Sequence, residues 1–326
     1  YFDGGNAIFR SDWSSEAVVA MVNGERDVAS EFGRDRNGLG VFPQSHEHAE
    51  PGAFLLAAYG EMLALDPGYL SFTERLLVSR PEHHNMILVD GRGPVDYLGA
   101  SFAWQSDPAG PVPADGQADL DAALDGDFLD AVRVRTTYGP APDRVAAIER
   151  RFLFADDAYL VAADRVRRIS DATDPPTPPS ELTWLVHGNG GETSGGSFVA
   201  LSDGGRWTRG AARLDAVLAL DDASASFATT PSNHEGPNRN LLQHTALQAR
   251  ASGDDLRSAL LLYPSRSGET APTRSALEIP GVAAVTLVDT ASDRRVLVAP
   301  RVPGPGMIDL PAGAAGLRAV RRDGWL

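Results

Sequence analysis

Four of the seven histidines fall within one short stretch of the chain, residues 46–84. The first two, His46 and His48, are two residues apart, so on an extended strand both side chains point to the same face, whereas on a helix they lie on different sides. Imidazole is both the commonest metal ligand and a common general acid or base. This stretch is therefore where chemistry is expected.

An aspartate and two further histidines follow the first pair at positions that suggest strand ends. The apolar segment 53–65 leads directly to Asp66, which precedes a Pro-Gly turn. His83 and His84 come immediately before the apolar run 86–89. We expect Asp66 at the end of one strand and His84 at the start of another.

Three side chains drawn from these strand ends, His48, Asp66 and His84, could bind a divalent cation. Two imidazoles and one carboxylate suit zinc, and three protein ligands leave a fourth position for water or substrate. Histidines near turns are also commonly exposed polar residues without a ligand. Residue types and spacing leave both interpretations open.

The elements expected to position these residues are almost all strands. Short apolar or alternating runs recur between Asp-Gly, Gly-Gly and Asn-Gly turns, which favours antiparallel sheets with one solvated face. Alternation is clearest in 213–220. Only two segments, 14–22 and 119–124, have helical character. Three stretches lack strand character: 107–127, 170–179 and 231–240.

These patterns predict an all-β protein, a large antiparallel two-layer β-sandwich. From residue 266 onward the strands become short and are punctuated by Pro and Gly, so we expect the sandwich over 1–265 and a small C-terminal β extension over 266–326. No run of 18 apolar residues encodes a membrane span. The chain opens on YFDGG without an initiator methionine or signal peptide, which suggests that an upstream part was removed or belongs to another chain.

Composition excludes several function classes. The net charge is −15, all 29 basic residues are arginines, and cysteine does not occur. Excess negative charge disfavours nucleic acid, and it weakens without excluding a polyanionic substrate. Without lysine there is no phosphate-binding loop of the Walker type, no G-x-S-x-G elbow is present, and a cysteine nucleophile is impossible.

The order of the motifs resembles the β-sandwich domain of the heparinase II/III-like polysaccharide lyases. SHEHAE, an apolar strand ending in D-P-G, and H-N before a further strand are followed by RRFLFADDAYLVAADRV, TWLVHGNG and LRSALLLYP. The resemblance covers roughly residues 1–265. It implies that His48, Asp66 and His84 bind a metal, usually zinc, and that His46 faces the substrate cleft. Two departures are Glu50, where relatives carry aspartate, and Tyr69, the one tyrosine between the aspartate and the last histidine.

The resemblance also implies a function. Such lyases cleave acidic, uronic-acid-containing polysaccharides by β-elimination, and most of their acid and base groups come from an N-terminal helical toroid. This chain would then be the β half of a secreted or periplasmic enzyme, inactive alone and working with a toroid upstream or in a separate chain. The metal would have a structural role, tying three strand ends together, rather than a catalytic one.

Individual roles follow from the same resemblance. His46 and Tyr69 are the catalytic candidates, and His187 and Asn189 of TWLVHGNG are expected to contact substrate. Simpler interpretations stay open. His46 could donate a hydrogen bond to a metal ligand, Tyr69 could pack against its own turn, and His187 could cap the end of a strand. His83, His234 and His244 are expected at the surface. The alternative function is a non-catalytic carbohydrate-binding or structural β-domain that keeps the metal for stability.

Overall fold

The computed structural model describes residues 5–24, 50–71, 74, 77–93, 118–126, 129–138, 145–169, 179–222, 224–279, 282–290 and 295–300. His46 and His48 lie outside these ranges, as do most of the loops expected at 107–127 and 170–179.

The strands form four sheets, and all strand pairings among the described residues are antiparallel. The first sheet holds β1 (Asn6–Arg10), β2 (Val19–Asn23), β3 (Phe54–Ala58) and β4 (Glu61–Ala64), in that order. The second has the order β14 (Ser226–Glu235), β15 (Leu241–Ser252), β10 (Glu181–His187) and β5 (Ile87–Val89). A short 3₁₀ helix, η2 (Pro81–His83), precedes β5.

The third sheet is the largest, with eight strands. Its order is β11 (Ser197–Leu201), β12 (Gly204–Arg209), β13 (Ala212–Leu220), β16 (Asp255–Arg266), β9 (Tyr159–Ile169), β8 (Val145–Ala155), β7 (Leu129–Tyr138) and β6 (Ala118–Leu124). The fourth sheet contains β17 (Thr273–Ile279), β18 (Val282–Asp289) and β19 (Arg295–Val298).

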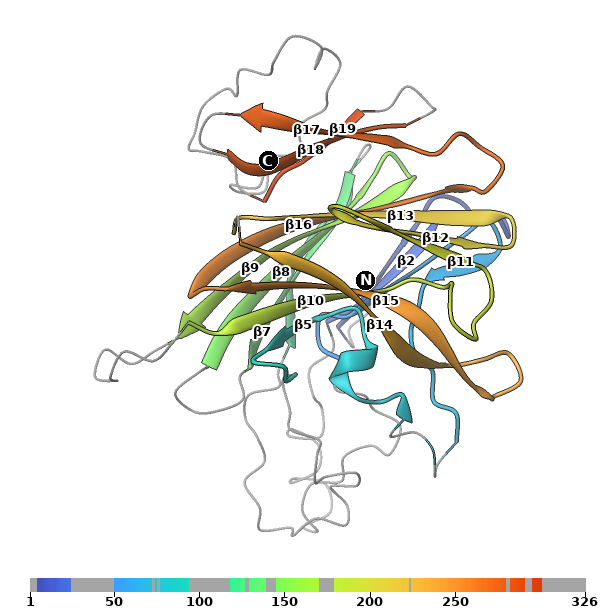
Figure 1. The fold of residues 1–326 in the computed structure, drawn as a ribbon, viewed down its shortest axis with the longest axis horizontal. Coiled ribbons are helices and arrows are strands. Elements are labelled where there is room, and N and C mark those ends of the chain that lie inside the picture. Colours follow the sequence, from blue (N-terminus) through green and yellow to red (C-terminus); the bar gives the residue numbers. More distant parts are fainter. Residues whose placement is uncertain are drawn as a thin grey trace.

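The first two sheets join into one layer. A bridge links Ala64, the last residue of β4, to Gly188 after β10, and the Leu65 amide donates to the His187 carbonyl at 2.7 Å. This composite layer faces the eight-stranded sheet (Figure 1), and the buried cluster between them includes Phe152 and Trp207. The predicted all-β antiparallel sandwich is confirmed.

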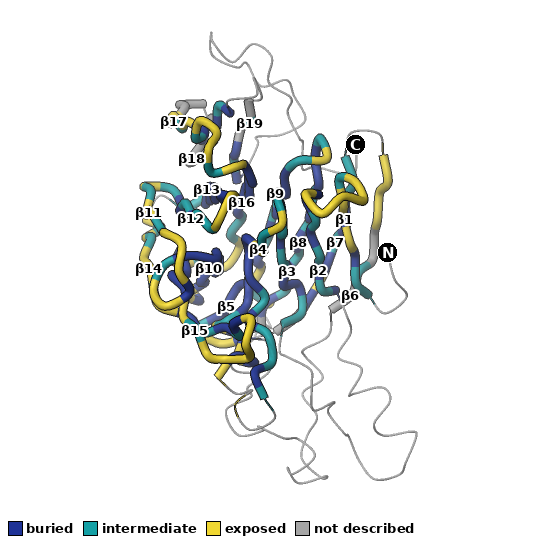
Figure 2. Tube along the Cα trace, turned by 90° about the vertical axis from the view of Figure 1, so that its right-hand side faces the viewer, coloured by how far each residue is buried: buried dark blue, intermediate teal, exposed yellow. Residues whose placement is uncertain are grey.

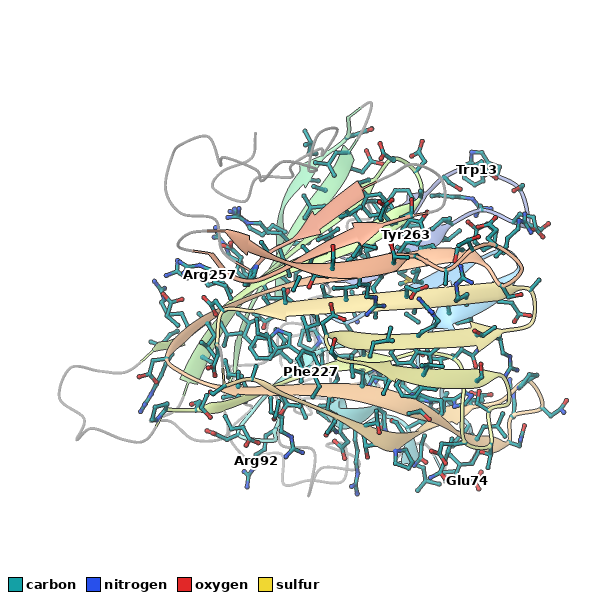
Figure 3. The ribbon with its side chains drawn as sticks, turned by 45° about the horizontal axis from the view of Figure 1, so that its top comes forward. Trp13, Glu74, Arg92, Phe227, Arg257 and Tyr263 are labelled. Atoms are coloured by element: carbon teal, nitrogen blue, oxygen red, sulfur yellow. The ribbon has the colours of Figure 1, made fainter. Side chains whose placement is uncertain are left out.

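The C-terminal sheet covers the opposite face of the eight-stranded sheet. Along β13, Leu214 and Leu218 belong to the main core, whereas Val217 and Ala219 belong to a second cluster that includes Val288 of β18. All nine residues of β13 are buried as a result (Figure 2), so the solvated face expected for residues 213–220 is wrong. Tyr263 of β16, labelled in Figure 3, belongs to the second cluster too.

Partly buried ion pairs and a hydrogen bond reinforce this contact. Arg274 of β17 donates to Asp203 at 2.8 Å and to Asp215 of β13 at 3.2 Å, and the Thr286 hydroxyl donates to Asp203 at 3.1 Å. The small C-terminal sheet is thus packed against the sandwich. Whether it is a separate unit beginning at residue 266 stays a prediction.

Three local expectations were wrong. Residues 19–23 and 118–124, expected to be helical in part, are strands β2 and β6, because pairing with neighbouring strands overrides helix propensity. In the stretch 231–240, expected to lack strand character, residues 231–235 instead form the second half of β14, and 236–240 form the turn to β15. Pro231 is tolerated there because β14 is an edge strand. The described residues contain no α-helix, and so none that could cross a membrane.

Candidate metal centre

Glu50 is placed by a tight turn before β3. The Ala53 amide donates to the Glu50 carbonyl at 2.9 Å, and Gly52 has a positive φ of 79°. Proline at the second position and a left-handed glycine at the third are the signature of a type II turn, so the sequence Glu-Pro-Gly-Ala encodes it locally. The turn holds the Glu50 side chain at the end of the sandwich where β2 and β3 pair.

Asp66 is placed by a second Pro-Gly turn, after β4. One of its oxygens, Oδ1, accepts a hydrogen bond from the Gly68 amide at 2.9 Å, and Gly68 has a φ of 75°. Glu235 at the end of β14 fastens this loop, because its carboxylate accepts from the amides of Tyr69 and Leu70, both at 2.8 Å. With Oδ1 engaged by its own loop, the other oxygen, Oδ2, faces the pocket.

His84 follows the 3₁₀ helix η2, whose turn closes when the His84 amide donates to the Pro81 carbonyl at 3.1 Å. The neighbouring Asn85 locks this segment in place. Its side-chain amide donates to the carbonyls of Phe54 and Leu65, at 2.8 and 2.9 Å. Its oxygen accepts from the His187 amide at 2.7 Å. In Figure 1 this cyan segment lies at the lower edge of the sandwich, beside β14.

The three loops bring two carboxylates and one imidazole together. His84 Nδ1 lies 2.8 Å from Glu50 Oε2 and 3.9 Å from Asp66 Oδ2, and the ligand atoms of all three residues lie within 4.8 Å of one another. Ligand atoms about 2.0–2.2 Å from a tetrahedral zinc are separated by about 3.3–3.5 Å, so small side-chain adjustments would suffice to bind one ion. The same three residues line a pocket together with Asn23 and Asn85.

Accessibility to solvent differs among the three side chains. His84 is fully buried, whereas the side chains of Glu50 and Asp66 are 21% and 39% exposed. The imidazole therefore forms the floor of the pocket, and the carboxylates form its rim. An ion could enter from solvent and reach all three without rearrangement of the sheets.

Electrostatics in the pocket favour an added positive charge. Burial alone would lower the pKa of His84, but the carboxylates of Glu50 and Asp66 outweigh burial and raise it. The pKa of Asp66 is raised as well, by burial and then by the adjacent Glu50 carboxylate. The cluster thus retains protons that a metal cation would displace.

Two of the three predicted ligands lie in this cluster. Asp66 and His84 meet as expected, and His48 lies outside the described residues. Glu50, first noticed only as a departure from the family pattern, is the third member of the cluster. Its signal in the sequence was the turn Glu-Pro-Gly-Ala, which places a carboxylate close to the expected ligands.

Among the catalytic candidates, His46 lies outside the described residues, and Tyr69 belongs to the loop that begins at Asp66. The Tyr69 hydroxyl is buried, and the Tyr69 amide is held by Glu235. These positions leave the proposed roles of both residues untested.

The substrate-contact candidates His187 and Asn189 are both buried. The Asn189 side chain donates to the Met62 carbonyl at 2.8 Å and accepts from the Ser194 hydroxyl at 2.8 Å. His187 Nδ1 lies 2.9 Å from His244 Nε2. Each thus has contacts within the protein, and substrate contact by either remains a prediction.

A row of buried histidines escaped the sequence analysis. His187, His244 and His234, from the neighbouring strands β10, β15 and β14, are linked in series, with His244 Nδ1 lying 3.1 Å from His234 Nδ1. The expected surface positions of His234 and His244 are wrong, since both are buried. Burial lowers the pKa of His244 to about 3 and that of His234 to about 4, so both are neutral at pH 7.

His83 also has a partner that was not foreseen. It is half-buried, and its Nδ1 lies 2.8 Å from the Ser232 hydroxyl of β14. Burial, followed by the nearby imidazole of His84, lowers the pKa of His83 to about 4. The two adjacent histidines therefore differ: His83 is directed to β14, whereas His84 is directed to the carboxylates.

Comparison with known proteins places these features in a family context. The model of the family described as "Heparinase II/III-like, C-terminal" matches residues 39–284. That range includes all three members of the cluster and extends past the expected boundary at residue 266. A search of curated protein sequences finds no match to the chain.

Solved structures share the fold at low sequence identity. A heparinase III superposes with a TM-score of 0.64 at 12% identity, covering 93% of this chain and 42% of its own. The heparan sulfate lyase HepC from Pedobacter heparinus has a TM-score of 0.63 at 16% identity, covering 91% and 41%. Another heparinase III structure has a TM-score of 0.63 at 10% identity, covering 92% and 42%. This chain therefore spans less than half the length of those proteins.

Proposed function

Because the chain belongs to the heparinase II/III-like family, whose C-terminal domain matches residues 39–284, we propose that it forms the β-sandwich part of a polysaccharide lyase. The substrate would be a uronic-acid-containing polysaccharide, cleaved by β-elimination. The observation that carries the proposal is the cluster of Glu50, Asp66 and His84 in a pocket at one end of the sandwich. Family membership supports the reaction class, and the cluster supports a site at this end of the fold.

We propose that Glu50, Asp66 and His84 bind a divalent metal, with zinc preferred. One imidazole nitrogen and two carboxylate oxygens are all zinc ligands, and His48, two residues before Glu50, would supply a fourth. A bound cation would neutralise the carboxylates and hold three loops together. Its role would be structural, because it would tie together the three loops that carry its ligands.

The chemistry of β-elimination defines what the protein must supply. The proton at C5 of a uronate is weakly acidic, so the neighbouring carboxylate must be neutralised, a base must take the proton, and an acid must protonate the departing C4 oxygen. On this wall of the cleft, His46 is the proposed proton donor or uronate contact. Tyr69 is the second candidate for the acid, and His187 and Asn189 are candidate substrate contacts.

The remaining acid and base groups would come from a helical toroid domain, upstream in the same protein or in a separate chain. The similar solved chains are more than twice as long as this one, which is consistent with a larger catalytic assembly. The chain alone is then expected to be inactive. A secreted or periplasmic location follows from the proposed polymeric substrate.

Ultraviolet absorbance tests this function directly, because β-elimination creates a conjugated unsaturated uronate. The full-length protein would be incubated with alginate, heparin, heparan sulfate and chondroitin sulfate, with the isolated chain of 326 residues in parallel. We expect an absorbance rise on one polymer with the full-length protein and none with the isolated chain. No rise on any of them would favour the alternative, a carbohydrate-binding or structural β-domain. Turnover by the isolated chain would show that the catalytic residues are assigned wrongly.

A further inference from the structure

A fully buried ion pair lies next to the loops that carry the candidate ligands. Arg150 of β8 and Asp164 of β9 are direct cross-strand partners, and their side chains are 3% and 0% exposed. Arg150 Nε donates to one Asp164 oxygen at 3.0 Å and Nη2 to the other at 3.4 Å. The Ser258 hydroxyl also donates to Asp164, at 3.0 Å. Asp164 thus fixes the orientation of the guanidinium.

The third guanidinium nitrogen, Nη1, binds two different loops. It donates to the Gly52 carbonyl at 2.8 Å and to the Asn85 carbonyl at 3.0 Å. Gly52 belongs to the turn that begins at Glu50, and Asn85 follows His84 directly. A single nitrogen therefore sets the spacing between the backbones that carry two of the three ligands.

The third ligand loop is joined to the same arrangement through one intermediate. Asn85, whose carbonyl Arg150 holds, donates through its side chain to the Leu65 carbonyl at 2.9 Å, immediately before Asp66. The chain of contacts from Arg150 therefore reaches all three ligand loops.

Packing leaves the guanidinium little freedom. Its central carbon lies 5.6 Å from the ring centre of Phe54 and 5.2 Å from that of Phe152. A Cβ atom added at Gly52 would lie only 3.2 Å from Arg150 Cδ. A planar fork with several donors fits this space, whereas the single flexible ammonium of lysine could not hold both carbonyls and the carboxylate in the same geometry.

We propose that Arg150, oriented by Asp164, is a positioning residue for the metal centre. This proposal rests on the proposed metal-binding function, because the role of Arg150 is to hold the Glu50 turn and the His84 segment at the spacing that one cation requires. Arg150 does not touch the ion. It acts through the carbonyls of Gly52 and Asn85.

The test compares zinc affinity with stability in matched variants of the full chain. Zinc binding would be measured by competition with a fluorescent chelator, and unfolding by urea in the presence of EDTA. Arg150→Lys is the principal variant. Its control is Arg213→Lys, because Arg213 of β13 is similarly buried, pairs with Asp215 at 3.3 Å and donates to the carbonyls of Glu269 and Thr270. Arg213 therefore contacts the connection between β16 and β17, and not the loops that carry the candidate ligands.

We expect Arg150→Lys to weaken zinc binding by about 10- to 100-fold, the usual effect of removing a group that orients metal ligands. Arg213→Lys is expected to bind zinc as the unsubstituted chain does, even if it is equally destabilised. Should Arg150→Lys not fold, the double variant Arg150→Met/Asp164→Leu removes both charges and replaces the pair by apolar side chains, a change that buried pairs often tolerate. The double variant should show the same loss of zinc affinity.

The outcomes separate the two proposals. Unchanged zinc affinity in a folded Arg150 variant would overturn the positioning role and leave the metal site standing. Failure of the unsubstituted chain to bind zinc would overturn the metal site, and the positioning role with it. A similar loss in Arg213→Lys would also contradict the proposal, because it would show that zinc affinity merely follows overall stability.

Discussion

Glu50 Oε2 lies 2.8 Å from His84 Nδ1, which joins a turn before β3 to the segment before β5. A carboxylate within hydrogen-bond distance of a fully buried imidazole is a contact that a metal ion can replace, because both groups become ligands once the shared proton leaves. The candidate centre depends on this contact.

Glu50 is predicted to be a metal ligand. Glu50→Gln keeps the shape of the side chain and removes its charge, so zinc affinity should fall by about 100-fold or more, since loss of even an orienting group costs about 10- to 100-fold. Isothermal titration calorimetry would measure the change. Glu82→Gln is the matched control, because Glu82 lies in η2 close to His84 and its exposed side chain pairs with Arg80 at 3.7 Å. Equal zinc affinity in the two variants would remove Glu50 from the ligand set.

Gly68 is predicted to be required by the Asp66 loop. Its φ is 75°, and an added Cβ would lie 2.6 Å from Glu235 Cβ. Gly68→Ala should therefore destabilise the protein by about 1–3 kcal/mol, the usual cost of backbone strain, with displacement of Glu235 in addition. Gly91→Ala is the control, because Gly91 has the same φ of 75° and no atom within 4 Å of the added Cβ. Urea unfolding should show the larger loss at Gly68, and equal losses would contradict the close approach of Glu235.

Zinc affinity is predicted to depend on pH. The pKa of His84 is raised above 6.5, chiefly because the carboxylates of Glu50 and Asp66 outweigh the effect of burial. The proton on His84 must leave before its Nδ1 can bind a metal, so affinity should fall by about tenfold per pH unit as the pH drops below that pKa. Titrations with zinc at pH 8, 7 and 6 would measure this. A dissociation constant that is the same at all three values would show that His84 is not a ligand.

The buried histidine row is predicted to make the fold acid-sensitive. In the unfolded chain His234 and His244 bind protons near pH 6.5, but in the folded protein burial lowers their pKa to about 4 and about 3. The unfolded state therefore binds more protons below pH 6.5, so stability is complete above that value and is lost as the pH falls. Each histidine should cost about 2 kcal/mol between pH 7 and pH 5.

Urea unfolding at the two pH values would measure this loss. His244→Gln should lose less stability on acidification than the unsubstituted chain, because one of the buried histidines that titrate on unfolding is removed. His187→Gln is a second variant expected to reduce the loss, because the pKa of His187 is also well below 6.5, through burial and then the neighbouring imidazole of His244. If acidification destabilised all three proteins equally, the row would not be the cause.

The sequence predicted the positions of Asp66 and His84 because the residues that form a turn lie next to one another in the chain. Asp66 could be placed at a strand end because Pro-Gly follows it, and His84 because an apolar run begins two residues later. Glu50 was not included in the ligand set, although the turn Glu-Pro-Gly-Ala carries a comparable local signal. The contact between Glu50 and His84 joins residues far apart in the chain, and local patterns do not encode such a pairing.

The largest errors came from strands that break the usual composition rules. Pro231 made the second half of β14 read as a loop, which concealed His234 and the anchor Glu235. An edge strand can accept proline because one side of it needs no hydrogen-bond partner, but edge position is a property of the assembled sheet. The burial of β13 on both faces was hidden for the same reason, since only the folded structure shows the C-terminal sheet covering it.

Diffraction at the zinc absorption edge tests the central claim most directly. Crystals of the full chain grown with zinc would be measured on both sides of the edge, with the anomalous difference map calculated for the whole molecule. We predict one strong peak, from a zinc ion bound by Glu50, Asp66 and His84. The peak should be lost in crystals of Glu50→Gln. A map without a peak in that pocket, or with zinc bound only at the other histidines, would contradict the account.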